Sequence, residues 1–395
     1  MRILHTADWH LCDKNGPIDR TADLQARVEE VAKLCESERI DVMAIAGDLF
    51  YENASPEQMA AALAHFRGAF KAFFARGGTV VAVTGNHDRD AKVEMIRAGM
   101  TLADPHAGAN QQFGGGRVYL ANRCGVLTLA DPAGRRVQFV LVPYPLASRY
   151  DIPVAGYRTR EEEHRLVQAE VAKWIGGVPE KDSFDPTVPT VLVAHLHVRG
   201  AQAHRLYKLD EGDDVLVDFA SLRPDWAYVA LGHVHKPQEL GGSRHVRYPG
   251  PLDRLDFGEK DDPRGVVAFE VDGTGLVGDV VWHELDATPF VDVTVTDPDA
   301  SLPPAPPRAI VRVTVGCQCQ SRDELNRRLK AAYPRLHQTK WPEPPRPGGA
   351  ASTFQPKASF EATVRDYLAD KLKDDPDRVA LLHLADTFLT PEADR

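Results

Sequence analysis

The sequence is poor in cysteine, and this scarcity counts against two kinds of stabilised fold. It has five cysteines in 395 residues, an odd number, and none of them belongs to a CxxC pair. A disulfide framework uses an even set of cysteines, and a zinc ribbon uses paired CxxC motifs. The fold therefore depends on a packed core, which a chain of this length can bury over two or three domains.

Long apolar runs and an excess of positive charge are also missing. No run approaches the ~20 apolar residues that cross a bilayer, and the opening MRILHTADWH lacks the apolar segment of a signal peptide. The sequence therefore predicts a soluble cytoplasmic protein with no membrane partner. The formal net charge is −10, whereas proteins that bind nucleic acid through overall charge are usually basic. Any DNA binding then needs a local patch, a metal site or a partner.

The first part of the chain alternates between short apolar runs and amphipathic segments. The apolar runs at 2–6, 42–47 and 79–84 predict strands, and the segments at 23–38 and 56–76 predict helices. Such alternation is typical of an α/β domain with partly parallel, buried strands.

Beyond residue 116 short strands follow one another, which predicts a second, more antiparallel sheet. We therefore expect an α/β fold of two stacked mixed β-sheets flanked by helices over residues 1–285. A small C-terminal α+β domain is expected over 286–340, with the proline-rich PDASLPPAPP at 298–307 as a linker. Residues 341–395 predict a further linker and a helical tail with apolar stripes.

Five predicted strands end in side chains of types that bind metals. These side chains are Asp8, His10, Asp48, Asn86, His87, His195, His197, His233 and His235. They offer oxygen or imidazole nitrogen and no thiolate, a set that suits manganese, iron or zinc, with magnesium as an alternative. Because one ion needs only about four to six ligands, this number predicts two ions that share a carboxylate.

The position of these side chains indicates a chemistry. Ligands of an open α/β sheet usually bind at the ends of its strands. Two ions about 3.5–4 Å apart clamp the attacking and leaving oxygens of a phosphoester and lower the pKa of the attacking water. In GNHD at 85–88, we expect Asn86 to bind a metal and His87 to contact the phosphate or donate a proton. Asp88 is then expected to orient the His87 ring.

Two further histidines have open interpretations. His5 falls on the strand face opposite Asp8, so it is expected in the core or behind the ligands. His197 shares the face of His195, and it is either a surface residue or a partner of the ligands.

The ordered motifs resemble those of the calcineurin-like metallophosphoesterases. They are D-x-H at 8–10, G-D at 47–48, G-N-H-D at 85–88, His195 and G-H-x-H at 232–235. More narrowly, MRILHTADWHL, AGDLF, VALGHVHKPQ and YPGPLDRLDFGE resemble the SbcD-type DNA double-strand-break repair nucleases. This resemblance covers residues 1 to about 285 and implies the metallophosphoesterase fold.

The resemblance also implies roles for single residues and partners for the chain. One metal is held by Asp8, His10 and His235, the other by Asn86, His195 and His233, with Asp48 as the bridge and His87 as the catalytic histidine. The implied cofactors are two Mn²⁺ ions. The implied activity is a 3′-to-5′ exonuclease on duplex DNA ends and an endonuclease on single strands. The implied assembly is a homodimer that works with an SbcC-type, SMC-like ATPase at the nucleoid.

Two departures from the family leave these ligands unchanged. Cys12 stands where the family usually has glycine, and Pro251 stands where many members have serine. Cys12 is then either redox-sensitive, because it follows the D-x-H motif closely, or a tolerated small residue.

Candidate surfaces for DNA and for the ATPase are less distinctive. Arg89 and Lys92 follow the catalytic turn, and Lys236 follows GHVH, but each has the alternative of a solvated charge. In the family, the domain at 286–340 caps the site and helps to place DNA over it. The helical tail at 341–395 docks on the ATPase coiled coil, with packing on its own chain as the alternative.

Three functions are weighed against one another. A manganese-dependent DNA nuclease subunit for break repair is the leading prediction. A stand-alone phosphodiesterase or phosphatase for a small nucleotide shares the metal site and suits the acidic net charge, but the extra C-terminal units and the SbcD-like strings count against it. A non-catalytic scaffold for the ATPase is opposed by the complete set of ligands.

Overall fold

The computed structural model describes residues 1–103, 117–131, 133–153, 156–202, 214–223, 225–319, 321–342, 360–373, 375 and 377–389. These belong to two compact units, Met1–Trp341 and Pro342–Arg395, which are described separately. No helix within the described ranges is long and apolar enough to cross a membrane.

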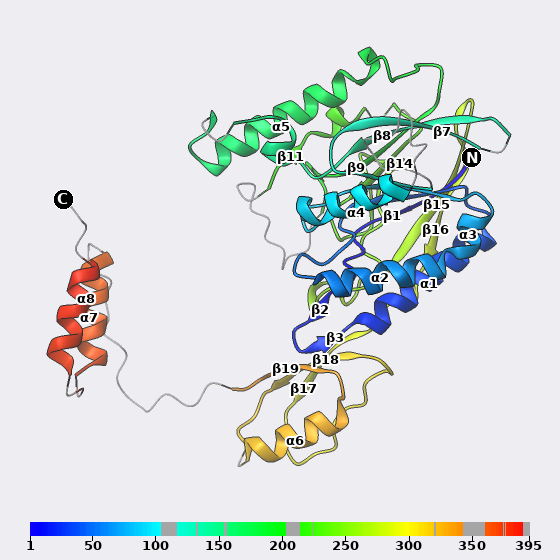
Figure 1. The fold of residues 1–395 in the computed structure, drawn as a ribbon. Coiled ribbons are helices and arrows are strands. Elements are labelled where there is room, and N and C mark those ends of the chain that lie inside the picture. Colours follow the sequence, from blue (N-terminus) through cyan, green and yellow to red (C-terminus); the bar gives the residue numbers. More distant parts are fainter. Residues whose placement is uncertain are drawn as a thin grey trace. The chain divides into compact units, whose positions relative to one another are not determined.

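The first sheet of the larger unit has six strands in the order β16-β15-β1-β4-β5-β6 (Figure 1). They are β1 (Arg2–Thr6), β4 (Val42–Ala46), β5 (Thr79–Val83), β6 (Val118–Ala121), β15 (Gly265–Asp272) and β16 (Gly275–Glu284). The first four of these run parallel, and β15 and β16 are antiparallel at one edge. β4 and β5 are buried along their whole length, as expected for parallel strands covered on both faces. The three strands predicted from the apolar runs are confirmed.

The second sheet has the order β13-β14-β12-β9-β8-β7. Its strands are β7 (Gly125–Ala130), β8 (Arg136–Val142), β9 (Thr190–His195), β12 (Tyr228–Gly232), β13 (Gln238–Leu240) and β14 (Ser243–Tyr248). The four middle strands, β14, β12, β9 and β8, are parallel, and only the two edge strands are antiparallel. The prediction of a more antiparallel sheet is therefore wrong, because long connections such as the one that contains α5 (Arg160–Gly176) return the chain for parallel pairing. The predicted pair of mixed sheets is confirmed.

The two sheets pack face to face, with helices on their outer faces (Figure 1). Buried side chains from both sheets, such as Val81 and Phe139, form the layer between them. α1 (Thr21–Ser37) and α2 (Pro56–Ala69) cover the outer face of the first sheet, and α5 covers the second. Helices outside two sheets leave the strand ends as the accessible edge of the sandwich.

The segment predicted as one helix over 56–76 is two helices. α2 begins with a capping box, in which the Ser55 hydroxyl accepts from Gln58 N and the Gln58 side chain accepts from Ser55 N. α2 ends at Ala69, and Phe70, with a φ of −90° and a ψ of 13°, separates it from α3 (Lys71–Ala75). Phe70 and Phe73 remain buried in the same core, so the apolar periodicity continues across the break and hides it.

A small three-stranded parallel sheet completes the larger unit. It contains β17 (Phe290–Val295), β18 (Ile310–Val315) and β19 (Leu336–Lys340), with α6 (Arg322–Ala332) between the last two. The expected linker at 298–307 lies inside this sheet, between β17 and β18, because parallel strands need a crossover. The Arg328 guanidinium fixes this crossover by donating to the carbonyls of Pro298 and Ala300.

The smaller unit contains two described helices, α7 (Phe360–Lys371) and α8 (Arg378–Leu389), joined by an ion pair between Arg365 and Asp386. Tyr367 and Val379 are 50% and 83% exposed. Most of the linker predicted after residue 341 lies outside the described residues. Docking of this tail on a partner stays a prediction.

Candidate metal centre

The fold gathers the predicted metal ligands at one edge of the sandwich. β1, β4 and β5 are parallel neighbours, so the loops after them leave the same edge of the first sheet. The loops after β1 and β4 are bonded together, because Asp8 N donates to the Gly47 carbonyl at 3.0 Å and His10 N donates to the Asp48 carbonyl at 2.9 Å. From the second sheet, the His195 ring reaches the Ala46 carbonyl of β4, at 2.7 Å from Nδ1. Both sheets therefore contribute to one site.

Several of these side chains are placed by an uncommon backbone conformation. Asp8, His10, Asp48 and His233 have φ values of 51°, 42°, 51° and 97°. Non-glycine residues in this region cost on the order of 1–3 kcal/mol each and persist only where their surroundings hold them, typically at functional sites. The sequence gives no sign of this strain, because none of the four is a glycine.

Two glycines make the close approach of the loops possible. A Cβ atom on Gly85 would lie 1.9 Å from Asp48 Oδ1, and one on Gly232 would lie 1.8 Å from the Ala46 carbonyl oxygen. Both distances are shorter than any tolerated contact, so the glycines of GNHD and GHVH are required sterically.

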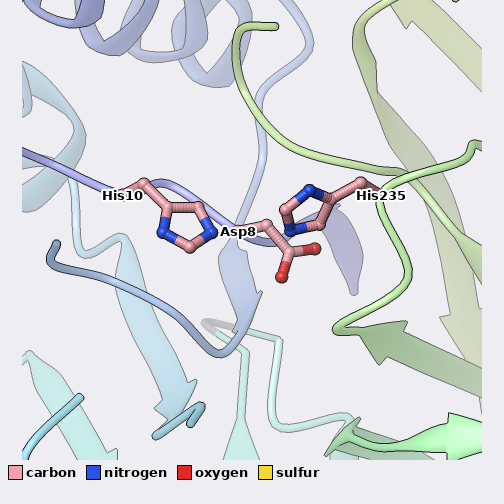
Figure 2. Close-up of side chains that lie close together, drawn as sticks. All are labelled: Asp8, His10 and His235. Atoms are coloured by element: carbon pink, nitrogen blue, oxygen red, sulfur yellow. The ribbon is translucent and has the colours of Figure 1, made fainter. Parts of the chain in front are cut away.

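The first group of ligands is Asp8, His10 and His235, whose ligand atoms lie within 4.8 Å of one another (Figure 2). In Figure 2 the two imidazole rings lie on either side of the Asp8 carboxylate, and their centroids are 5.4 Å apart. His10 Nε2 is buried, and among the described residues it has no hydrogen-bond partner. A buried nitrogen without a partner is costly, and a cation between these side chains would satisfy it.

The second group of ligands is Asn86, His195 and His233. Asn86 Oδ1 lies 3.0 Å from His195 Nε2 and 3.1 Å from His233 Nδ1. Asp48 lies between the groups, since its Oδ2 is 3.5 Å from His10 Nε2 and 3.4 Å from His195 Nε2. The seven predicted ligands are thus brought together with one carboxylate shared, an arrangement that fits two divalent cations. Their assignment as ligands stays a prediction.

Three of the histidines are each held by the nitrogen that faces away from the centre. His195 Nδ1 is held by the Ala46 carbonyl, His235 Nδ1 lies 2.8 Å from Glu259 Oε1, and His233 Nε2 lies 2.6 Å from Asp214 Oδ2. A hydrogen bond at one ring nitrogen fixes the tautomer and leaves the lone pair of the other for a metal. His195 and His235 would therefore bind through Nε2, and His233 through Nδ1.

Glu259 and Asp214 are site residues that the sequence reasoning missed. Glu259 lies in the string YPGPLDRLDFGE, which signals a family resemblance but not a contact with His235. It is fully buried and accepts from Arg264 Nη2 at 2.7 Å and from Leu255 N at 2.8 Å. Asp214 is the last acid of DEGDD at 210–214, a stretch that reads as a solvated loop.

Burial and neighbouring charges set the protonation of the centre in the absence of a metal. Burial favours the neutral form of Asp48, but the His195 and His10 rings hold its pKa well below the ordinary value. Burial lowers the pKa of His10 to about 3, so that this imidazole is neutral. Against the effect of burial, the Asp48 and Asp8 carboxylates raise the pKa of His195 to about 9. A cation that binds here therefore displaces a proton from His195.

His87 lies beside the first group. Its ring centroid is 4.9 Å from that of His10, its backbone N donates to Asp48 Oδ1 at 2.9 Å, and its side chain is 31% exposed. The nearest described carboxylate oxygen to its Nδ1 is Glu52 Oε2, at 4.0 Å. His87 is thus both close to the ligands and open to a substrate.

The prediction that Asp88 orients the His87 ring is wrong. Asp88 Oδ2 accepts from Leu49 N and Gly85 N, and Oδ1 accepts from Phe50 N, at 2.9–3.1 Å. Asp88 therefore ties the GD loop to the GNHD turn. Burial raises its pKa to about 6, and the three backbone donors oppose that rise. Asp88 follows His87 directly, but its side chain bonds to these backbone groups instead of the ring; among the described carboxylates, Glu52 is the one within 4.0 Å of His87 Nδ1.

The remaining candidates are placed as follows. Lys92 Nζ donates to the carbonyls of Glu52 and Ala54, at 3.1 and 2.7 Å, so it supports the loop beside His87. Lys236 Nζ donates to Gln202 Oε1 at 3.0 Å, and Arg89 is exposed. DNA binding by these three residues stays a prediction.

His5, His197 and Cys12 have clearer settings. His5 is core, because it is fully buried with ring nitrogens 3.2 Å from Tyr228 Oη and from the Leu231 carbonyl. His197 is a partner of the ligand shell, since its Nδ1 lies 3.0 Å from Asp214 Oδ2. Cys12 has a φ of 73°, a conformation that glycine adopts without strain, and burial raises the pKa of its thiol.

Comparison with known proteins agrees with this geometry. The family model described as calcineurin-like phosphoesterase matches residues 1–237, more than half of the chain. The chain belongs to the calcineurin-like phosphoesterase family, and the protein is a metal-dependent phosphoesterase. The resemblance drawn from the ordered motifs is confirmed.

Two curated relatives share the name of one nuclease subunit. The chain is 29% identical over 282 residues to the SbcD subunit of the nuclease SbcCD from Rhodobacter capsulatus, covering 69% of this chain and 67% of that protein. It is also 29% identical over 272 residues to the same protein of Escherichia coli K12, covering 66% of this chain and 62% of the relative. The chain thus spans about two thirds of the length of these relatives. A solved dimetal phosphatase from Danio rerio is 12% identical, with a TM-score of 0.38 over 72% of this chain and 95% of the other.

Proposed function

We propose that the protein is a manganese-dependent DNA nuclease. It acts as a 3′-to-5′ exonuclease on duplex ends and as an endonuclease on single strands. The observation that carries the proposal is the Asp48 carboxylate, shared by two groups of ligands and flanked by the open His87 ring. The choice of DNA as the phosphoester substrate rests on the relatives named as the SbcD subunit of the nuclease SbcCD.

The residues divide the work as follows. Asp8, His10 and His235 would hold one ion, Asn86, His195 and His233 would hold the other, and Asp48, which lies between the two groups, would serve both. When bound, two such ions polarise the phosphate and lower the pKa of the attacking water. The oxygen and imidazole donors suit Mn²⁺ and leave Mg²⁺, Fe²⁺ and Zn²⁺ as alternatives.

His87 is the residue of this chain that contacts the phosphate. Its Nδ1 is buried toward Glu52, so Nε2 is the nitrogen that reaches the substrate. From that position it hydrogen-bonds a phosphate oxygen or donates a proton to the leaving oxygen. Asp88 acts behind it by fixing the turn rather than the ring.

The proposed setting is DNA break repair in the cytoplasm, at the nucleoid, as a homodimer with an SbcC-type ATPase. The acidic net charge supports a need for such a partner, because overall charge does not attract DNA. The exposed side chains of α7 and α8 are the proposed docking surface for the ATPase coiled coil, as an amphipathic helix packs into an apolar groove.

The test is Mn²⁺-dependent cleavage of end-labelled duplex and single-stranded DNA, with and without the ATPase, beside hydrolysis of bis-p-nitrophenyl phosphate. We expect both DNA substrates to be cut, and His87→Ala to abolish cleavage. His65→Ala is the matched control, because His65 lies on α2 and pairs with Glu29 at 3.1 Å. Hydrolysis of the small diester with DNA intact, even with the ATPase, would replace this proposal with the small-nucleotide phosphodiesterase.

A further inference from the structure

A buried carboxylate lies behind the second group of ligands. Asp214 is 4% exposed, and its Oδ2 lies 2.6 Å from His233 Nε2 and 3.0 Å from His197 Nδ1. One oxygen thus accepts from two imidazoles. The His233 and His197 ring centroids are 5.9 Å apart, which leaves the carboxylate between them.

The Asp214 carboxylate is itself held in place by its other oxygen. Oδ1 accepts from the Tyr144 hydroxyl at 2.9 Å and from Val215 N at 2.8 Å. Immediately after it, β11 (Leu216–Val217) pairs in parallel with β10 (His197–Val198). This short pairing fixes the distance between Asp214 and His197, so the carboxylate is a built feature and not a loose surface acid.

His233 has a specific need for such a support. Its φ of 97° is strained, and its backbone is held mainly through its N–H, which donates to Asp8 Oδ1 at 3.0 Å. Its ring packs against those of Tyr144 and His195, with centroids 5.4 and 5.1 Å away, and packing alone does not select the tautomer of an imidazole. A hydrogen bond from Nε2 to Asp214 fixes the tautomer and keeps the Nδ1 lone pair on the side of Asn86 Oδ1.

We propose that Asp214 is a positioning residue of the second metal site, which fixes the tautomer and direction of His233 and anchors His197 with the same oxygen. The inference rests on the two-metal function proposed above. It assigns to Asp214 no contact with the substrate. His197 is then expected to contribute less to metal binding than Asp214, because the bond between Asp214 and His233 does not require it.

The test measures metal binding rather than catalysis. Mn²⁺ is titrated into the full metal-free chain by calorimetry, and low-temperature electron paramagnetic resonance reports the exchange-coupled pair of ions. We expect Asp214→Ala to weaken the second ion about 10–100-fold, and to remove the coupled signal at concentrations where the unsubstituted chain shows it. Binding of the first ion stays unchanged. Asp214→Asn keeps an acceptor oxygen and restores part of the affinity, and His197→Ala changes it little.

The matched control is Asp218→Asn, which removes a nearby exposed carboxylate that pairs with Arg199 at 2.9 Å. Melting of each metal-free variant separates loss of folding from loss of the ion. Equal second-site affinity in the unsubstituted chain and in Asp214→Ala overturns the proposal. Three ions in the unsubstituted chain and two in Asp214→Ala overturn it in favour of a third ion at His197, Asp214 and His233. If the unsubstituted chain binds only one ion, the proposed two-metal function is wrong, and this inference is wrong with it. If the chain binds two ions but does not cleave DNA, the proposed substrate is wrong and the role of Asp214 still holds.

Discussion

The two groups of ligands differ in what lies behind them. Behind His235 is Glu259, a fully buried carboxylate paired with the fully buried Arg264. Behind His233 is Asp214, which is held by neutral donors and a second histidine. The first group is therefore supported by a buried ion pair, and the second by a buried loop end that is held through hydrogen bonds.

This difference teaches how metal binding is coupled to folding. A carboxylate with a buried cationic partner cannot be removed without leaving that cation uncompensated. Removing it therefore lowers both the metal affinity of the first group and the stability of the fold. A carboxylate with neutral partners can be changed at lower cost. The second group can therefore vary in affinity while the fold persists.

The largest effect expected from this comparison follows Glu259→Ala. It leaves the buried Arg264 guanidinium without its carboxylate, and breaking such a pair costs about 3–5 kcal/mol. Denaturant unfolding of the metal-free protein should show this loss, together with loss of the first ion. Asp214→Ala is the matched variant and should lose clearly less stability. Equal losses in the two variants would contradict the distinction between the groups.

A smaller effect is expected in the order of metal binding. The first group is buried, whereas Asn86 in the second is exposed, so two Mn²⁺ ions should bind with unequal affinity. In calorimetric titration, His235→Ala should remove the tighter phase and Asn86→Ala the weaker one. If Asn86→Ala removes the tighter phase instead, the second group binds its ion more tightly than the first and the comparison is reversed.

A smaller effect again is expected beside His87. Glu52 is 4.0 Å from His87 Nδ1 and its side chain is 44% exposed, so it guides the ring only weakly. Glu52→Gln should lower kcat about two- to fivefold with KM unchanged, since an exposed pair contributes at most about 1 kcal/mol; the assay uses bis-p-nitrophenyl phosphate with saturating Mn²⁺. Glu29→Gln, which alters an exposed partner of His65, is the control. An unchanged kcat would show that Glu52 does not orient His87.

These effects also mark what the sequence could and could not predict. Side chains at the ends of parallel strands meet wherever the strands meet, so Asp8, Asp48 and His195 were predictable from periodicity and motif order. Glu259 and Asp214 were not, because their contacts depend on segments that return to the site after long connections. Asp88 was misassigned because proximity in sequence was taken as contact between side chains, although adjacent side chains point apart.

The parallel pairing of the middle strands in the second sheet was not predicted, for a related reason. Apolar periodicity predicts a strand but not its partner, and β8, β9 and β12 read the same whether they pair in parallel or antiparallel. The connection that contains α5 was the available signal, since a helix between two strands favours parallel pairing.

The smallest effect expected tests whether the first group of ligands depends on the conformation of the loop that contains Cys12. Cys12 follows His10 in the loop that the GD segment holds, with a φ of 73° that glycine adopts without strain. Cys12→Gly should therefore change the free energy of unfolding by no more than about 1 kcal/mol, because relief of strain in the folded state is offset by the larger entropy of glycine in the unfolded chain. Denaturant unfolding measures this change, and Mn²⁺ titration should show an unchanged first site. A weaker first ion would mean that the strained residue helps to aim His10, and that the first group depends on its loop as well as on the core behind it.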